Sequence, residues 1–576
     1  MLRRWLALAL RPVRGLGTAE RIVVFGVAVL HAFGIGWGLP STDGWDVDGI
    51  APRDFLPGLV ETFTPGHYFT YPPLHLALLA LVTLPVTLIQ LLRAPSLAPG
   101  DLVETFLSVP VMTTFALAAR VVSLLMSLGV ALMVGRIAKA IFPGSRSARA
   151  WAMAICGVEV AGTYYAHTTN LDLPALFWAS AALLVLVLAL ERDEPRRLRG
   201  VAVLAAFAIA TKDQSYAVFA LSMPVVLVAW TLARPRGGRV EVAREALYCA
   251  AIAVVLVLVL DAAPFNPTGF AARVRFLTGP ASQDFAQHSR DWAGRLSALE
   301  DAVRFFPNHY PLALAPILAA GLVVAVTSNV GRGRLGAAIP LLAAASFTLA
   351  FNCVARRVEE RFMMPQMQLL AVYGGGIGVA IERSLAAGRR GRAAFVAVTA
   401  GVAVLLGVRL SASMLLTMTG DARYAAERWL SEHVAPGELV EVYGGNVYLP
   451  RFSPALTIER VDTRPTRSRN PMPGIVERQD RLGNIEARRP RWIVVGMGHA
   501  WRYLQEERAP SDGRVLPRIQ REGLADADTR DFFRALFAEE AGYRKARVFH
   551  YEGSALLPPR PLHASLATDV FVFERR

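Results

Sequence analysis

The chain has 576 residues, of which 54% are hydrophobic and 19% are charged. Soluble domains carry about 25% charged residues, so this composition excludes an ordinary soluble protein as well as a disordered or collagen-like chain. The three cysteines all lie inside apolar segments, which excludes a disulfide framework. The formal net charge of +15 comes mostly from short connectors between apolar runs, so we predict a membrane protein that binds no nucleic acid.

Apolar segments follow one another up to about residue 420. Several contain no Asp, Glu, Lys or Arg and reach or approach the length of about 20 residues that a bilayer crossing needs. They predict an all-α polytopic membrane bundle of about 11 transmembrane helices, with additional juxtamembrane helices in the first outer loop. The predicted crossings are residues 22–40, 116–136, 150–168, 172–191, 199–211, 214–233, 245–263, 310–329, 335–355, 363–382 and 393–417.

The connectors between these crossings differ in basic charge. One alternating set is rich in Lys and Arg, whereas the other contains only Lys212, Arg356, Arg357 and Arg361. Cytoplasmic loops are the basic ones, so the pattern predicts a cytoplasmic N-terminus and an extracytoplasmic C-terminus. A crossing by the apolar residues 72–92 would invert this order, and we therefore expect them to lie in the outer interface. The basic connectors are residues 136–149, 192–199, 234–244, 332–334 and 383–392.

The predicted outer side contains three larger segments. Two are the outer loops 41–115 and 264–309 of a transmembrane domain that covers residues 1–419. The third is the tail, residues 420–576, which we expect to form a small extracytoplasmic α/β domain. Its apolar residues recur at helical spacing in 422–430, and its short strand patterns are residues 438–443, 492–497 and 569–573.

The loop after the first predicted helix is acidic. Between Ser41 and Tyr71 it has five carboxylates against one arginine. A carboxylate near the low-dielectric region of the membrane can have a raised pKa and act as a base, although a solvated loop kept outside by topology would have the same composition. The five acids are Asp43, Asp46, Asp48, Asp54 and Glu61.

The other unusual polar motifs are predicted at the same membrane face. A proline pair follows Tyr71 at the start of the interfacial helix, and a late motif reads Arg361-Phe-Met-Met-Pro365. Polar motifs that gather at one face indicate a site at the outer interface. The remaining members are Arg120-Val-Val-Ser123, His167, Asp172, Lys212 and Arg357.

This arrangement resembles the GT-C superfamily of integral-membrane glycosyltransferases, and among them the protein O-mannosyltransferases and the lipid A aminoarabinose transferases. The resemblance covers most of residues 20–420 and rests on the order of the acidic loop, the Pro-Pro-Leu helix, the Arg-x-x-Ser motif and the Arg-Phe-x-x-Pro motif. It implies transfer of a hexosyl or pentosyl group from a polyprenyl-phosphate donor to an acceptor on the far side of the membrane, with inversion. The acceptor class, whether lipid, glycan or protein, stays open.

The resemblance also implies that the catalytic base is an Asp of the first outer loop. On this chain that residue is Asp46 or Asp48, and the sequence does not decide between them. In an extended segment both side chains point to one side, so one can act as the base while the other orients the acceptor or binds a divalent metal. Apart from this possible metal, no cofactor is implied by the resemblance.

The leaving lipid phosphate needs positive charge around it. The aminoarabinose transferases have Lys before the proline pair, where this chain has Tyr71, so the phosphate contact must come from other residues. A guanidinium suits phosphate better than an ammonium does, although Arg361 could instead anchor the protein to lipid headgroups and Arg120 could pair with Asp172. The candidates for donor or substrate binding are Arg361, Arg357, Lys212 and Arg120, with Tyr71, Asp172 and His167 beside them.

A multi-pass lipid or solute transporter, without bond chemistry, is the alternative. Glu159 supports it, because an acid inside an apolar segment often marks a transport path, although we expect a hydrogen-bonded bundle residue there. The dominance of Arg over Lys is typical of a GC-rich bacterial genome and favours a bacterial inner membrane. In either case the protein contacts membrane lipids directly.

Overall fold

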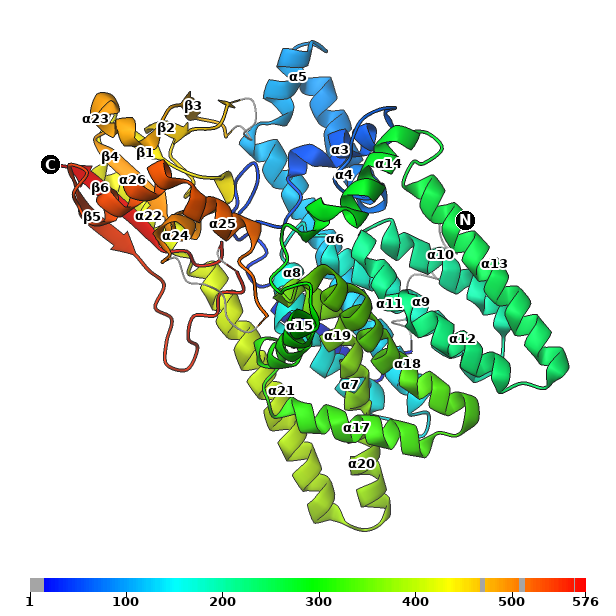
Figure 1. Ribbon diagram of the computed structural model, residues 1–576. Coiled ribbons are helices and arrows are strands. Elements are labelled where there is room, and N and C mark those ends of the chain that lie inside the picture. The colour runs from blue at the N-terminus through cyan, green and yellow to red at the C-terminus, as the bar shows by residue number, and fades with distance from the viewer. Residues whose placement is uncertain (1–14, 467–471, 507–512, 564) are drawn as a thin grey trace.

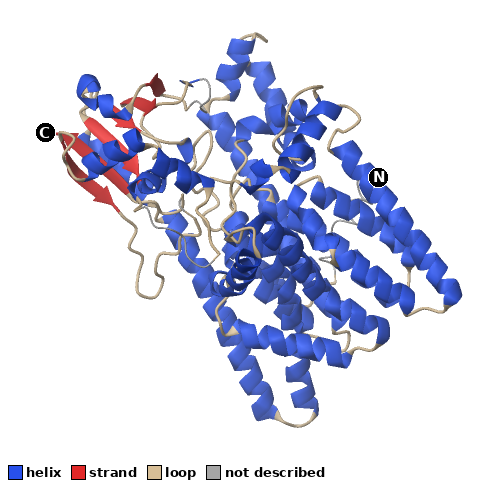
Figure 2. Cartoon of the chain, viewed as in Figure 1, coloured by secondary structure: helices blue, strands red, loops and turns tan. Residues whose placement is uncertain are grey.

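The computed structural model describes residues 15–466, 472–506, 513–563 and 565–576. Figure 1 shows a large helical bundle with a small sheet region at its upper left, and Figure 2 shows that the strands gather there. The fold class that the sequence predicts, a polytopic helical bundle with a small C-terminal α/β region, is therefore confirmed.

The first helix leads directly into the acidic loop and a layer of short helices. The helix α4 begins at Pro73, where a proline is favoured because the first turn does not need its missing N–H group. Ile50 and Phe55 pack against α4 and α6 in one buried apolar cluster, which ties the loop to the bundle. These elements are α2 (Thr18–Ala32), η1 (Pro52–Asp54), α3 (Phe55–Phe63), α4 (Pro73–Arg93), α5 (Pro99–Phe106) and α6 (Val109–Ile141).

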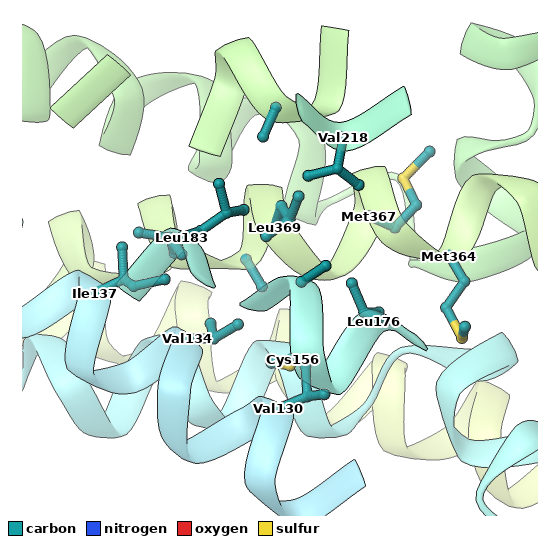
Figure 3. Close-up of a cluster of buried hydrophobic side chains, with 14 of the residues drawn as sticks. Val130, Val134, Ile137, Cys156, Leu176, Leu183, Val218, Met364, Met367 and Leu369 are labelled. Atoms are coloured by element: carbon teal, nitrogen blue, oxygen red, sulfur yellow. The ribbon is translucent and has the colours of Figure 1, made fainter. Parts of the chain in front are cut away.

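The remaining bundle helices surround α6 and α9. Figure 3 shows part of their core, where Val130 and Val134 of α6 face Leu176 of α9 and Leu369 of α19. The elements are α7 (Ala148–Gly157), α8 (Val160–Tyr165), α9 (Asp172–Arg192), η2 (Pro195–Arg197), α10 (Leu198–Ile209), η3 (Asp213–Ser215), α11 (Tyr216–Ala220), α12 (Ser222–Leu232), α13 (Arg236–Leu260), α14 (Pro267–Thr278), η4 (Pro280–Gln283), α15 (Trp292–Arg304), α16 (Phe306–His309), α17 (Leu314–Ser328), α18 (Gly331–Phe347), the π-helix η5 (Thr348–Arg356), α19 (Glu360–Leu370), η6 (Ala371–Gly374), α20 (Gly375–Ala386) and α21 (Arg390–Thr419).

Within the described residues, eight helices are long and apolar enough to cross a membrane, or nine if the bent pair 292–309 and 314–328 is one span. The predicted number of about 11 crossings stays a prediction, because α2, the pair α7–α8 and α10 are shorter than this test requires. One of the eight is α4, so the interfacial position of residues 72–92 also stays a prediction. Length and apolarity permit a crossing but do not determine how a helix is tilted.

The predicted crossing 150–168 is interrupted at Glu159. Its carboxylate accepts hydrogen bonds from the backbone N–H groups of Ala161 at 2.9 Å and Gly162 at 2.5 Å, and so caps the start of α8. His309 Nδ1 lies 2.5 Å from Oε1, and Gln368 Nε2 donates to Oε2 at 3.1 Å. Glu159 is thus the hydrogen-bonded bundle residue that we expected.

The C-terminal region is a six-stranded sheet in the order β3-β2-β1-β4-β6-β5. The strands β3, β2, β1 and β4 are parallel, whereas β6 runs antiparallel to both β4 and β5. The strands are β1 (Leu439–Val442), β2 (Thr457–Asp462), β3 (Ile475–Gln479), β4 (Trp492–Gly496), β5 (Tyr543–Phe549) and β6 (Val570–Arg575). Strand patterns at β1, β4 and β6 are predicted from the sequence, but β2, β3 and β5 are not, because charged residues interrupt their apolar alternation.

Helices cover both faces of this sheet. Val440 and Val494 pack with α22 on one face, and Ile493 and Phe573 pack with α26 on the other, as period-two alternation requires. The helical elements are α22 (Ala422–His433), η7 (Asn446–Tyr448), η9 (Leu482–Asn484), α23 (Ile485–Arg488), α24 (Met497–Leu504), α25 (Arg518–Ala525) and α26 (Ala527–Phe537).

Candidate functional site

The acidic loop is held in place by the C-terminal region. The indole N–H of Trp45 donates to the Leu449 carbonyl at 3.0 Å, and the Arg423 guanidinium lies 4.0 Å from the centre of the Trp45 ring. The Tyr424 ring packs on the same indole at 4.8 Å. Because Trp45 immediately precedes Asp46, these contacts set the position of the carboxylate that follows.

Asp46 is buried, with 6% of its surface exposed. Its Oδ1 accepts hydrogen bonds from the Tyr164 hydroxyl and from the Asp48 N–H group, both at 3.2 Å. No hydrogen bond of normal geometry reaches Oδ2 from the described part of the chain. Burial, and after it the negative charge of Asp48, raises the pKa of Asp46 to about 7, against the opposing effect of its hydrogen bonds. Such a carboxylate can accept a proton near neutral pH.

Asp48 behaves differently because cations surround it. Its carboxylate forms an ion pair with Arg361, and its carbonyl accepts a hydrogen bond from the Asn170 side chain at 3.2 Å. Burial acts to raise the pKa of Asp48, but the charges of Arg361, Lys212 and other cations together lower it below the ordinary value. The surroundings therefore shift the pKa values of the two carboxyl groups in opposite directions, and Asp46 is the one that exchanges its proton near pH 7.

A hydrogen-bonded chain from the tail reaches Asp46. Burial lowers the pKa of His563 to about 4, so its imidazole is neutral at pH 7 and has one donor and one acceptor nitrogen. Nδ1 lies 2.9 Å from the Ser565 hydroxyl, and Nε2 lies 2.6 Å from the Tyr164 hydroxyl. If Ser565 donates to His563 and His563 donates to Tyr164, the Tyr164 proton is free to point at Asp46. This order of donors suits an ionised Asp46.

Three cations gather around Phe362, on the Arg361 side of Asp48. The centre of the Phe362 ring lies 4.6 Å from the Arg361 guanidinium, 4.8 Å from that of Arg357 and 5.8 Å from the Lys212 ammonium. Glu359 accepts from Arg357 at 2.8 Å and from Arg361 at 3.1 Å. Lys212 lies 2.5 Å from an Asp172 carboxylate oxygen. The cluster has the charge and the planar donors that a phosphate group requires.

The other predicted site residues lie around this centre. Tyr71 is 38% exposed and lines the same cavity as Asp46. Both ring nitrogens of His167 lie 2.7 Å from backbone carbonyls, those of Thr163 and Phe33, so this histidine joins two helix ends. It does not reach the cation cluster through any hydrogen bond that the described residues show.

Arg120 is oriented away from the cation cluster. Its Nη1 donates to the Ile35 and Trp37 carbonyls, both at 2.7 Å. The hypothesis that it pairs with Asp172 is wrong, because Asp172 pairs with Lys212. The buried guanidinium satisfies these two backbone carbonyls, which follow α2, and the predicted role of Arg120 in donor binding stays a prediction.

A cavity of about 380 Å³ lies between the acidic loop and the sheet region. Asp46, Arg53 and Tyr71 line it from the loop side, and Gly445, Asn446 and Arg460 line it from the sheet side. A second cavity of about 650 Å³ is almost wholly apolar and lies among α3, α4, α5 and α6. Arg53 lines both cavities, so the apolar cavity adjoins the cavity that Asp46 lines.

A divalent metal at Asp46 and Asp48 fits these residues poorly. One of the two carboxylates is engaged by Arg361. Throughout the described ranges, no three His, Cys, Asp or Glu side chains are grouped closely enough to hold a metal ion. Hard cations prefer six or more oxygen ligands, so we assign no step to a metal.

Tyr164, His563 and Glu359 are the members of the site that sequence reasoning missed. Tyr164 is one of two adjacent tyrosines before His167, and this aromatic pair inside a predicted crossing is the only local signal. His563 follows Pro561 and Leu562 in an ordinary stretch of the tail, without any motif around it. Only the folded chain brings it to the loop.

Comparison with protein families supports the resemblance. Residues 107–263 match the family described as dolichyl-phosphate-mannose-protein mannosyltransferase. A search of curated proteins found no match. The matched family consists of glycosyltransferases, and the match confirms the predicted resemblance to the GT-C superfamily. Together with the long apolar helices, it supports the prediction of an integral membrane protein.

Three solved structures are similar to this chain. ArnT from Cupriavidus metallidurans in the apo state is 15% identical, with 83% of this chain and 93% of that chain covered and a TM-score of 0.44. The Archaeoglobus fulgidus oligosaccharyltransferase in complex with Zn and sulfate is 13% identical, with coverages of 84% and 69% and a TM-score of 0.48. The S. cerevisiae protein O-mannosyltransferase complex bound to the sugar donor is 16% identical, with coverages of 48% and 38% and a TM-score of 0.31.

Proposed function

We propose that this GT-C-like protein transfers a sugar from a polyprenyl-phosphate donor to a hydroxyl group of an acceptor, with Asp46 as the catalytic base. The observation that carries the proposal is the juxtaposition of a proton-accepting Asp46 with the Asp48–Arg361 ion pair and two further cations. A base beside a phosphate-binding cluster is what this reaction requires.

In this reaction Asp46 removes the proton of the acceptor hydroxyl as its oxygen attacks the anomeric carbon. The bond from that carbon to the phosphate oxygen breaks, and the polyprenyl phosphate leaves with the bonding electron pair. Arg361, Arg357 and Lys212 stabilise its negative charge, exchanging their present carboxylate partners for phosphate oxygens. Attack from the face opposite the phosphate inverts the anomeric configuration.

We assign different roles to the two aspartates. Asp48 is a weak base because cations lower its pKa, whereas Asp46 takes up a proton near neutral pH. Before the donor binds, Asp48 holds Arg361 beside the reaction centre through their ion pair. Tyr164 and His563 act as positioning residues, since they orient Asp46 through hydrogen bonds.

We further propose that the site faces the extracytoplasmic side of a bacterial inner membrane. The basic connectors between α12 and α13 and between α20 and α21 lie at the ends of the bundle away from the sheet (Figure 1), which supports this orientation. The apolar cavity beside Arg53 suits the isoprenoid chain of a lipid-linked substrate. Residues 1–419 then form the catalytic membrane domain, and residues 420–576 form an outer domain that closes the site.

The test is transfer from polyprenyl-phosphate-linked sugars by the purified protein in nanodiscs, using native membrane extract as acceptor. A general base contributes about 100-fold or more, so Asp46→Asn should lose at least that factor while it still binds the donor. Glu61→Gln is the matched control, because Glu61 belongs to the same acidic loop but is exposed and does not line the cavity that Asp46 lines.

Wild-type rates in Asp46→Asn would contradict the assignment of the base. Movement of lipid across vesicle membranes by both Asp46→Asn and Asp48→Asn, without any sugar transfer by the wild type, would favour the transporter. The transporter has lost its best support, because Glu159 caps α8 and is fully hydrogen-bonded.

A further inference from the structure

A second polar cavity, of about 400 Å³, lies inside the C-terminal region. It is formed where β1, β2 and β4 end, by the turn Tyr443–Gly445, by Asp462–Arg464 and by His499 at the start of α24. The helices α25 and α26 close its outer wall through Ile519 and Thr529. We call this cavity the sheet-edge groove.

The topology explains why a groove forms there. The strands β1, β2 and β4 are parallel, so their carboxyl ends meet at one edge of the sheet. From β1 the chain continues to β2 on one side, and β4 lies on the other side. The connections therefore diverge around β1 and leave a crevice at the carboxyl end, which is the usual ligand position in open parallel sheets.

The groove combines aromatic faces with opposed charges. Tyr448, His499 and Tyr503 are all half-buried there, with ring centres 6.1 Å apart for the first pair and 5.6 Å for the second. The charged lining consists of Asp462, Glu522 and Asp526 against Arg464 and Arg502. With both signs present in nearly equal number, the lining does not favour an anion, but it offers many hydrogen-bond donors and acceptors.

The sheet-edge groove adjoins the cavity that Asp46 lines. Gly444, Gly445, Asp462 and Arg464 line both. Gly444 has a φ angle of +92°, and a Cβ atom there would lie 2.5 Å from His499 Cγ, so only glycine lets the turn after β1 pass this close to α24. A Cβ atom at Gly445 would meet nothing within 4 Å, so there is free space beside this residue, which lines both cavities.

We propose that the sheet-edge groove binds the acceptor, and that this acceptor is an uncharged, hydroxyl-rich glycan chain whose end reaches Asp46. The inference rests on the proposed function, because a bound glycan is an acceptor only if the protein transfers sugar. The binding itself requires no sugar transfer. Tyrosine faces cover the apolar C–H surfaces of sugar rings, and the carboxylates and guanidiniums pair with the hydroxyl groups.

The geometry favours a glycan over a nucleotide or a peptide. A nucleotide or lipid phosphate is disfavoured because carboxylates outnumber guanidiniums in this lining, by three to two. An extended peptide commonly adds to the free edge of a sheet, which here is β3 or β5, whereas the groove lies at the strand ends. A chain of sugar rings suits a polar space that is lined by aromatic faces and hydrogen-bonding groups and that adjoins the cavity of Asp46.

The experiment measures binding of mannohexaose, maltohexaose and arabinohexaose to the full-length protein in nanodiscs by saturation-transfer NMR and calorimetry. At least one hexasaccharide should bind the wild type. Tyr503→Ala should weaken that binding about tenfold, as truncation of an aromatic contact residue does. Trp501→Ala is the matched control, since Trp501 belongs to the same helix α24 but does not line the groove.

Because Tyr503 also stacks on Phe533 at 5.3 Å, Ile519→Trp serves as a second variant that fills the groove from α25 without removing this contact. It should abolish hexasaccharide binding, whereas Asp46→Asn should retain it. Absence of binding by all three sugars, binding unchanged in Ile519→Trp, or preferential binding of inorganic phosphate, ADP or an acidic peptide would overturn the proposal. Sugar binding without any sugar transfer would instead overturn only the proposed function.

Discussion

Asp46 in the outer loop and Glu159 in the membrane bundle are both buried carboxylates, and their surroundings differ in one decisive respect. Glu159 receives hydrogen bonds from two backbone N–H groups and from Gln368, and it pairs with His309. Asp46 has hydrogen-bond partners on Oδ1 but none on Oδ2 among the described residues, and the residue lines a cavity. Burial alone therefore does not mark a reactive acid, whereas burial beside an open, polar space does.

The comparison predicts opposite effects for two substitutions, and these are the largest we expect. Asp46→Asn should reduce sugar transfer about 100-fold or more. Since the folded-state pKa of Asp46 is raised to about 7, its ionisation costs stability increasingly as pH rises from about 4 to 7. The variant should therefore unfold at an equal or higher temperature than the wild type at pH 8, as measured by thermal unfolding in nanodiscs.

Glu159→Ala should have the opposite effects, a loss of stability with little change in sugar transfer. It leaves His309 and two N–H groups without their partner, which should destabilise the bundle by about 3 kcal/mol. Sugar transfer per folded molecule should stay within about twofold of the wild type. Loss of transfer with unchanged thermal stability would show that Glu159 belongs to the reaction, and the contrast with Asp46 would fail.

Substitutions of Arg361 test the proposed phosphate-binding part of the site. Removal of one donor to a developing negative charge costs about 100- to 1000-fold, so Arg361→Ala should lower kcat by that factor. Arg361→Lys should recover only part of it, because an ammonium lacks the planar fork. Arg304→Ala is the control, since Arg304 is an exposed residue of the helix α15. Equal activity of Arg361→Ala and the control would exclude the proposed phosphate contact.

His563 should show a smaller effect, because it acts through Tyr164. His563→Ala should lower kcat about tenfold with KM for the donor unchanged, since it disturbs only the orientation of Asp46. His563→Gln, which can donate one hydrogen bond to Tyr164, should restore part of the rate. A loss in KM without a change in kcat would contradict the positioning role.

The smallest expected effect is a displacement of the pH profile. Wild-type kcat/KM should rise as pH increases through about 7, where Asp46 loses its proton. In Asp48→Asn the negative charge that helps to raise this pKa is absent, so the residual activity should rise at a lower pH than in the wild type. A loss of this titration in Asp48→Asn, with an activity as low as that expected for Asp46→Asn, would indicate that Asp48, and not Asp46, is the titrating base.

Much of the fold follows from patterns that are local in sequence. The apolar runs and the basic connectors predict a polytopic bundle, and the alternation in 492–497 predicts the strand β4. The break at Glu159 was not predicted, because the apolar run around it shows neither that its carboxylate caps a new helix nor that His309 and Gln368 lie beside it. The strands β2, β3 and β5 were missed for a similar reason, since their charged residues find partners only across the folded sheet, as Arg460 does with Glu477.

The candidate site, like the fold, was only partly predictable from the sequence. Sequence order places Asp46, Asp48 and Arg361 at one predicted membrane face, but it does not assign different roles to the two aspartates. Their difference arises because Arg361 pairs with one carboxylate while Tyr164 binds the other. His563 had no motif to reveal it.

The amino-acid sequence by itself determined a membrane bundle, the sign of charge on each set of connectors and the residue types available at one face, because hydrophobicity, charge and motif order are properties of the chain. The tertiary structure alone decided which aspartate can exchange a proton, that the tail completes the site through Leu449 and His563, and that a groove lies at the sheet edge. Burial, ion pairing and hydrogen bonding depend on distances between residues hundreds of positions apart, and only folding sets those distances.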